Sequence, residues 1–128
     1  MLQNDFFTIV SQVSGEGKLT GVLEFDPAHA IFKGHCPGVP VVPGVCMMQM
    51  VKEMLENAIG VETMLRKAMS MKFLTLINPL VNRSVMFEIN YTSDLQVSAS
   101  LYNESVVYFK FKGGFERLPS CEGGRLTK

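Results

Sequence analysis

The sequence predicts an α+β fold in which a long antiparallel sheet wraps around one helix. Two observations support this class. From residue 80 onward, apolar and polar residues alternate with a period of two, which is typical of strands with one buried face. Between residues 43 and 59, apolar residues recur instead at spacings of three and four, which is the helical pattern. One helix beside a series of strands is the composition of an α+β domain.

The C-terminal strands are predicted from this alternation and from the short polar segments between them. The alternating stretches are residues 84–92, 95–101 and 107–112. Because the connections are only a few residues long, we expect the three strands to form an antiparallel meander.

Three further strands are predicted upstream of the meander. Residues 6–13 and 18–25 predict a hairpin that turns in the glycine-containing segment 14–17. Another strand is expected over residues 67–76, ahead of a turn at Asn78 and Pro79.

The helix is predicted to run from about residue 43 to residue 59. Pro43 suits the first turn, where its missing N–H costs no hydrogen bond, and Gly60 suits the left-handed position that ends a helix. The apolar face is rich in methionine. We interpret this face as core packing and not as a cofactor site, because methionine fills irregular gaps well.

Composition and charge exclude several classes of protein. The chain has 128 residues, of which 47% are hydrophobic and 19% charged, and this predicts one globular domain over residues 1–128. Twelve basic residues balance twelve acidic ones, so net charge gives no argument for binding nucleic acid. No apolar run approaches the roughly 20 residues that span a bilayer, so we expect no membrane insertion.

Cysteine usage predicts a reduced, cytoplasmic protein without a metal. Cys36, Cys46 and Cys121 are odd in number and lack Cys-x-x-Cys spacing, and only two histidines are present. The N-terminus carries Asp5 and alternates like a strand, so no signal peptide is expected. From about residue 118 the chain is polar and glycine-rich, and we expect a mobile tail.

The residues just before the helix suggest a binding site. A helix that begins near Gly44 leaves its first backbone N–H groups without partners and carries the positive end of the helix dipole. Such an end can hold an anion or the oxygen of a polarised carbonyl, and Gly44 lets a ligand approach because it has no Cβ. His35, in the same proline-rich stretch, can exchange a proton near neutral pH. His35 is therefore either a catalytic base or a hydrogen-bonded structural histidine, and His29 is interpreted as structural.

At this stretch the sequence resembles a known family. Residues 34–45 read GHCPGVPVVPGV, which is very similar to the GHFPGxPxxPGV signature of the hotdog-fold 3-hydroxyacyl-ACP dehydratases of fatty acid synthesis. Residues 71–83, MKFLTLINPLVNR, resemble the xxFxxPVxPGD strand and turn of the same family. The order of the elements also agrees, so the resemblance covers roughly residues 5–115.

The resemblance implies a fold, a reaction and an assembly. The fold is a curved antiparallel sheet around one long central helix, and two subunits pair to form two active sites at their interface. The implied activity is that of a hydro-lyase without a cofactor. It converts a 3-hydroxyacyl thioester on acyl carrier protein, or a CoA thioester, into the trans-2-enoyl thioester. We therefore expect a homodimer in fatty acid or related polyketide or polyene synthesis, with a trimer of dimers left open.

The resemblance also assigns the site residues. His35 removes the C2 proton, and the N–H of Gly44 polarises the thioester carbonyl. The N–H of Val45, the next unpaired donor at the helix start, is a second candidate for the same oxygen. The family's catalytic acid lies fourteen positions after the histidine, where this chain has Gln49. An amide can donate a hydrogen bond but cannot lose a proton at neutral pH, so the acid is missing from its usual place.

Glu53 is a candidate replacement for that acid. It lies four residues after Gln49, on the same helix face, and could reach the site directly or through a water. The alternative is that Gln49, Glu53 and their polar neighbours Lys52 and Glu56 form an exposed stripe, which the usual exposure of charged residues favours.

Three functions therefore stay open. The first is a dehydratase for 3-hydroxyacyl thioesters. The second is a hotdog acyl thioesterase, in which Gln49 positions the attacking water and Glu53 acts as the base. The third is a non-catalytic subunit that binds acyl-ACP or pairs with an active homologue.

Overall fold

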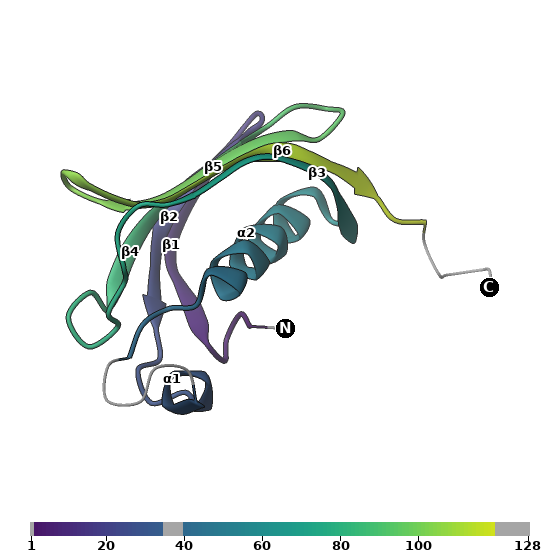
Figure 1. The fold of residues 1–128 in the computed structure, drawn as a ribbon. Coiled ribbons are helices and arrows are strands. Elements are labelled where there is room, and N and C mark those ends of the chain that lie inside the picture. The colour runs from purple at the N-terminus through teal and green to yellow at the C-terminus, as the bar shows by residue number, and fades with distance from the viewer. Residues whose placement is uncertain (1, 35–39, 120–128) are drawn as a thin grey trace.

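The computed structural model describes residues 2–34 and 40–119. The elements in chain order are β1 (Phe7–Gly15), β2 (Lys18–Phe25), α1 (Ala30–Gly34), α2 (Gly44–Ile59), β3 (Thr63–Phe73), β4 (Ser84–Tyr91), β5 (Gln96–Asn103) and β6 (Val106–Arg117). The six strands form one antiparallel sheet in the order β1-β2-β4-β5-β6-β3. The sheet curves over α2, as Figure 1 shows, which confirms the predicted α+β class and is consistent with a hotdog fold.

The predicted hairpin and meander are both confirmed. β1 and β2 pair from Phe7↔Phe25 to Gly15↔Lys18, and β4, β5 and β6 pair in sequence. Gly17 is required at the first turn for two reasons. Its φ is 69°, and an added Cβ would lie 2.7 Å from the carbonyl oxygen of Tyr91.

β3 differs from its predicted bounds of 67–76. It begins at Thr63 and ends at Phe73, because it pairs with β6 from Thr63↔Arg117 to Phe73↔Phe109. β6 is correspondingly longer than predicted and reaches Arg117. The alternation in β3 is weak because this strand lies at the edge of the sheet and is largely exposed on both faces.

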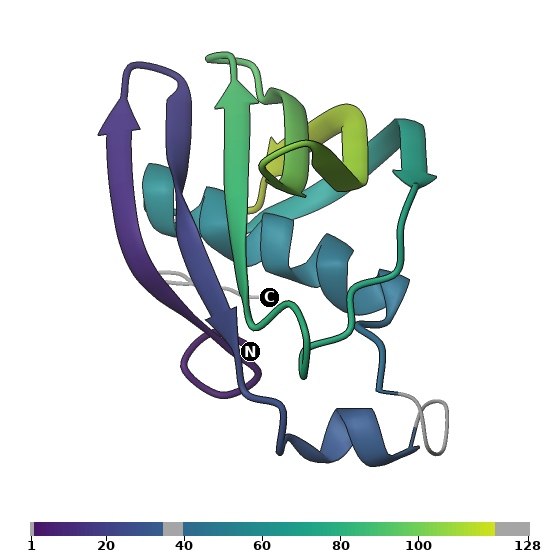
Figure 2. The same ribbon diagram turned by 90° about the vertical axis from the view of Figure 1, so that its left-hand side faces the viewer.

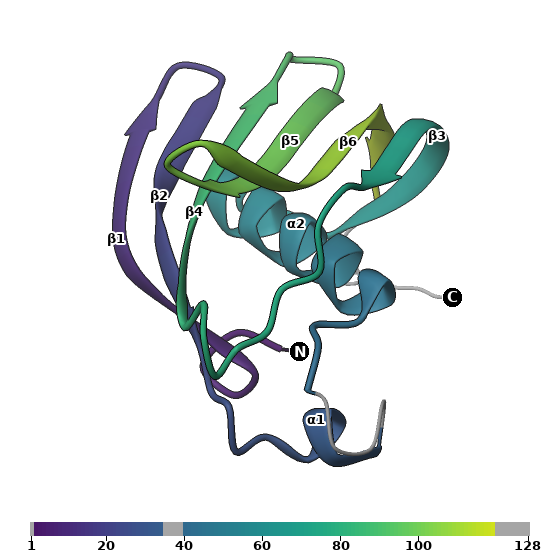
Figure 3. The same cartoon turned by 60° about the vertical axis from the view of Figure 1, so that its left-hand side comes forward.

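Helix α2 was predicted almost to the residue. Its C-cap is Gly60, whose φ is 77° and whose N–H donates to the carbonyl oxygen of Glu56 (2.8 Å). The methionines on its inner face are buried, so the core-packing interpretation is confirmed: Met47, Met50 and Met54 are at most 4% exposed. Figures 2 and 3 show α2 lying across one face of the sheet, with no helix on the other face in the described part of the chain.

A second, short helix was not predicted. α1 contains five residues, Ala30–Gly34, which is too short to show a helical period in the sequence. Its first turn is capped by His29, whose Nδ1 accepts a hydrogen bond from the backbone N–H of Ile31 (3.1 Å). The prediction of a single helix is therefore wrong in this respect.

Two further expectations from the sequence concern a mobile C-terminal tail and membrane insertion. The predicted mobile tail falls almost wholly in residues 120–128, outside the described residues. Leu118, at the start of the predicted tail, is described, and its N–H donates to the carbonyl oxygen of Glu62 (2.9 Å). Across residues 2–34 and 40–119, neither helix has the length and apolar character needed to cross a bilayer.

Candidate functional site

The head of α2 carries backbone donors without a capping side chain. Its N-cap is Pro43, with φ −65° and ψ 146°, and no side chain caps the helix there. The carbonyl oxygen of Pro43 accepts from the N–H groups of Cys46 (3.0 Å) and Met47 (3.1 Å). Within the described residues, the N–H groups of Gly44 and Val45 make no such bond. These two donors are the ones that the sequence assigned to a carbonyl oxygen.

An apolar hollow lies directly beside the first of these donors, Gly44. It has a volume of about 430 Å³ and is lined by residues 41–44, by residues 73–76 and by Met47. The ring of Phe73 packs against Gly44, because a Cβ added at Gly44 would lie 2.8 Å from Phe73 Cε1. An apolar hollow next to two unpaired N–H groups suits an acyl chain with a polarised carbonyl.

Phe73 is a site residue that the residue-by-residue analysis did not single out. Its ring stacks on Phe109 with centroids 5.1 Å apart and is still 52% exposed. A signal was present, since Phe73 is the phenylalanine of the second resembling segment, residues 71–83. The backbone N–H of Val42 donates to the carbonyl oxygen of Ile77 (2.9 Å), which ties this segment to the entrance of α2.

Of the two histidines, the structure describes only His29. His35 lies in residues 35–39, outside the described residues, so its assignment as a base stays a prediction. His29 is structural, as expected. Its Nε2 lies 3.0 Å from Asp5 Oδ2, and its Nδ1 caps α1.

Glu53 is buried, which contradicts the expectation of an exposed polar stripe. Its side chain is 2% exposed and accepts from the backbone N–H groups of Leu2 and Gln3, both at 2.8 Å. Gln49 Nε2 also donates to it (2.9 Å). The stripe fails here because the N-terminus folds across this part of α2 and supplies the donors.

The other half of the expected stripe is as predicted. Lys52 Nζ donates to Glu56 Oε2 (2.9 Å) as an ordinary i,i+4 pair. Glu56 also accepts from the backbone N–H of Thr63 (2.7 Å). Partial burial by itself would raise the pKa of Glu56, but the hydrogen bonds from Lys52 and Thr63 outweigh it, so the pKa is lowered.

One chain does not bring all the candidate residues into one described hollow. Gln49 lies five positions after Gly44. In an α-helix this separates the two residues by about 7.5 Å along the axis and about 140° around it. Neither Gln49 nor Glu53 lines the hollow at Gly44. The structure thus places Gly44 against Phe73, and separately pairs Gln49 with Glu53.

Cys46 and metal binding add nothing to this site. Burial raises the pKa of the Cys46 thiol, which disfavours the reactive thiolate. Among the described residues, no three His, Cys, Asp or Glu side chains gather as metal ligands would.

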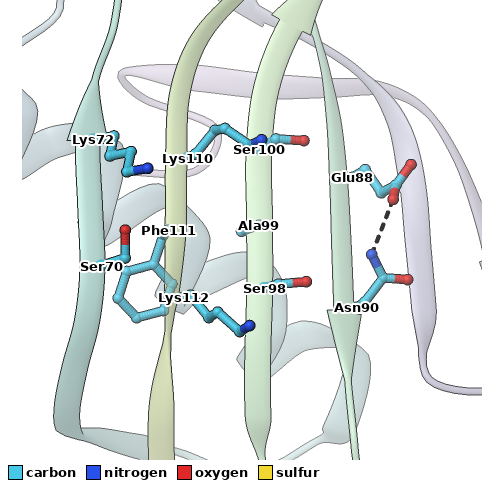
Figure 4. A pocket seen from close by; sticks show the side chains of 10 residues that line it. All are labelled: Ser70, Lys72, Glu88, Asn90, Ser98, Ala99, Ser100, Lys110, Phe111 and Lys112. Carbon is cyan, nitrogen blue, oxygen red and sulfur yellow. Dashed lines mark hydrogen bonds between the residues drawn. The ribbon is translucent and has the colours of Figure 1, made fainter.

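A second hollow, of about 440 Å³, lies on the outer face of the sheet. Figure 4 shows Lys72, Lys110 and Lys112 around it, with Ser100 beside Lys110 and Ser98 beside Lys112. These side chains project from the face opposite α2. The hollow is therefore separate from the head of the helix and from Gln49.

Two solved structures share this fold. The dehydratase heterocomplex ApeI:P from Xenorhabdus doucetiae contains a chain that superposes with a TM-score of 0.73 at 17% identity, covering 85% of this chain and 96% of that one. An uncharacterized protein from Erwinia carotovora subsp. atroseptica gives a TM-score of 0.67 at 17% identity, covering 84% and 91%. At this identity the likeness establishes the fold.

The sequence itself establishes the family. Residues 11–113 match the ApeI-like family, described as ApeI dehydratase, and the chain belongs to this family. No curated protein matches it in sequence. The predicted resemblance to a dehydratase family is thereby confirmed at the level of the family.

Proposed function

We propose that this protein is a dehydratase that converts 3-hydroxyacyl thioesters into trans-2-enoyl thioesters. The observation that carries the proposal is an apolar hollow lined by Gly44 at the uncapped start of α2, next to the N–H of Val45, in a chain of a dehydratase family. The donors suit the thioester oxygen, on which negative charge develops when the C2 proton is removed. The hollow suits the acyl chain.

The remaining roles follow the sequence motif. His35 takes the C2 proton. The electron pair of the broken C2–H bond then forms the C2–C3 double bond as the C3–O bond breaks. The departing hydroxide needs a proton to leave as water. Gln49 contacts the hydroxyl but cannot supply this proton. Glu53 is buried and already accepts three hydrogen bonds, so the proton comes from the protonated His35.

The substrate is proposed to arrive on acyl carrier protein or CoA, in fatty acid or related polyketide or polyene synthesis. The reaction needs no cofactor, because it moves only protons and a hydroxyl group. We place it in the cytoplasm, because three cysteines without Cys-x-x-Cys spacing give no sign of a disulfide framework. A similar chain occurs in a dehydratase heterocomplex, so a second dehydratase subunit is a further candidate partner.

The active unit is proposed to be a homodimer that pairs along β3. This strand is the last of the sheet, so its outer edge has unpaired backbone groups. Its exposed side chains include Met69 (61%), Met71 (37%) and Phe73 (52%), which a second copy would cover. A second copy would also complete the site, since Gln49 is absent from the hollow at Gly44 in its own chain.

A thioesterase is the second candidate. The hydrogen bond between Gln49 and Glu53 supports it, because that function needs an amide to hold water beside a carboxylate. Against it, Glu53 already accepts from two backbone N–H groups and the Gln49 amide. Little acceptor capacity is left to take a proton from water.

The test is an assay with 3-hydroxyacyl and saturated acyl thioesters of pantetheine. We expect enoyl thioester to form from the first, no free thiol from either, and loss of activity in His35→Ala. Release of thiol from the saturated thioester would favour the thioesterase. Binding of both without turnover, unchanged in His35→Ala, would favour the non-catalytic subunit.

A further inference from the structure

Glu53 is an acceptor for three donors in a buried position. Oε1 accepts from the backbone N–H of Gln3, and Oε2 accepts from the backbone N–H of Leu2 and from Gln49 Nε2. The side chain is 2% exposed, so water does not replace these partners freely. Each oxygen of Glu53 is thus already engaged as an acceptor.

This arrangement decides which end of the Gln49 amide faces Glu53. Backbone N–H groups can only donate, so both Glu53 oxygens present lone pairs. The Gln49 oxygen would repel those lone pairs, whereas its NH₂ group satisfies them. Nε2 is therefore the atom held at Glu53, and Oε1 is left for a ligand.

The two backbone donors are themselves fixed by the N-terminal segment, residues 2–6. The N–H of Phe6 donates to the carbonyl oxygen of Leu2 (2.7 Å), which closes the segment into a turn. Phe6 is fully buried and stacks on Phe32 of α1, with centroids 4.9 Å apart. Asn57 donates to the side-chain oxygen of Gln3, which adds a second tie to α2. The segment thus holds its donors against α2 independently of Gln49.

We propose that Glu53 is a positioning residue, and that through it the N-terminal segment fixes Gln49 with its carbonyl oxygen toward the substrate. The consequence is a specificity at C3 of the acyl chain. A hydroxyl at C3 can donate a hydrogen bond to Gln49 Oε1, whereas an oxo group has only lone pairs and leaves both oxygens unpaired. Gln49 therefore selects 3-hydroxyacyl over 3-oxoacyl thioesters. This inference rests on the proposed function, because it assumes that the substrate is a thioester with a substituent at C3.

The first experiment compares the affinity of two non-reacting probes by calorimetry. They are 3-hydroxyacyl- and 3-oxoacyl-pantetheine in which an amide nitrogen replaces the thioester sulfur. Wild type should bind the hydroxyl probe about tenfold more tightly, which corresponds to one hydrogen bond of ordinary strength. In Glu53→Gln the ratio of the two affinities should be near one. The new amide can donate as well as accept, so the Gln49 amide is free to rotate by 180°. Gln49→Met should also bring the affinity ratio near one, while the hydrogen bonds from Leu2 and Gln3 to Glu53 stay intact. This variant replaces Glu53→Gln in the experiment if Glu53→Gln folds poorly.

The matched control is Glu56→Gln. It makes the same change on the same helix, at a carboxylate that binds Lys52 and Thr63 and not Gln49. Its preference for the hydroxyl probe should equal that of wild type. Amide hydrogen exchange supplies a readout without any ligand. Glu53→Gln should speed exchange at the N–H groups of Leu2 and Gln3, and Glu56→Gln should not.

The outcomes separate this inference from the proposed function. If both probes bind wild type equally, or if Glu53→Gln keeps the tenfold preference, the specificity is overturned and the dehydratase proposal stands. If neither probe binds wild type, the proposed function fails and the specificity fails with it. Exchange at Leu2 and Gln3 that is unchanged in Glu53→Gln would overturn the anchoring role of Glu53 whatever the probes do.

Discussion

Two carboxylates about one turn apart on α2 have different partners and different consequences. Glu53 is enclosed by backbone donors and by Gln49, and we propose that it positions Gln49, which stands where the resemblance places a catalytic acid. Glu56 binds Lys52 and Thr63 at the start of β3 and secures the end of the helix. In the proposed mechanism the first acts on the reaction through Gln49, and we expect the second to affect only stability.

Replacing Gln49 by Glu should restore a proton donor. The new carboxyl would lie about where the amide now contacts Glu53, at 2.9 Å, and two carboxyls so close cannot both ionise. The shared proton is the acid that the leaving hydroxyl needs, so dehydration should rise by part of the roughly 10²–10⁴-fold that acid catalysis supplies. The rate should fall as pH rises and the pair loses this proton. A rate that is unchanged at every pH would show that Gln49 is no handicap.

Glu56→Gln should make stability less dependent on pH. The pKa of Glu56 is lowered in the folded protein, so its stabilising effect is present above the pKa of the unfolded chain and is lost as pH falls through the folded pKa. The variant should therefore be less stable than wild type by about 1 kcal/mol at neutral pH, and equally stable in acid. Urea unfolding at both pH values measures this. An equal loss at both would mean that packing, and not charge, is responsible.

At the scale of the elements, α2 and the first hairpin were predictable because their signals are local. Pro43 and Gly60 mark the ends of the helix, and its methionine spacing marks the buried face. The burial of Glu53 was not predictable, since its donors are Leu2 and Gln3, about fifty residues earlier in the chain. β3 was displaced because an exposed edge strand lacks the alternation that a buried face imposes.

Gly44→Ala tests the close packing between α2 and β3. The new Cβ would lie 2.8 Å from Phe73 Cε1, so the ring must move into the apolar hollow. Because Phe73 is half exposed and can move, we expect a loss of stability of only about 1 kcal/mol. The displaced ring would occupy the acyl-chain hollow, so binding of the acyl thioester should weaken at least tenfold. Phe73→Leu should relieve the clash when combined with Gly44→Ala. Binding that stays weak in the double variant would point to the helix backbone instead.

The outer face of the sheet carries opposed like charges. Lys72 lies directly opposite Lys110 in the β3–β6 ladder, and Ser100 flanks Lys110 on the other side. Like charges in this position destabilise a sheet, so Lys110→Glu should raise the free energy of unfolding by about 0.2–1 kcal/mol. Added salt should reduce the difference in unfolding free energy between Lys110→Glu and wild type. Lys110→Gln, which removes the charge without reversing it, should stabilise the protein less than Lys110→Glu. A destabilised Lys110→Glu would mean that the hollow of Figure 4 prefers positive charge.

At the scale of the whole molecule, the sheet has two free edges that differ in their surroundings. β1 forms one edge and β3 the other. The head of α2 lies beside β3, as the contact between Gly44 and Phe73 shows, so only a copy that pairs at β3 lies next to the proposed site. The family resemblance leads us to expect a dimer but does not say which edge pairs, because both edge strands carry exposed apolar residues.

Charged substitutions at the two edges distinguish them. Met71→Lys on β3 places a charge among exposed apolar side chains that a second copy would cover, so the proposed dimer should dissociate at micromolar concentration. Val13→Lys on β1, where the valine is 71% exposed, is the matched control and should leave the dimer intact. Light scattering measures the mass of each variant. The dissociated Met71→Lys protein should still fold, because the core lies within one chain, but it should lose dehydration, since Gln49 and the Gly44 hollow would no longer meet. Full activity in a monomeric Met71→Lys variant would show that one chain suffices and that Gln49 takes no part in the reaction.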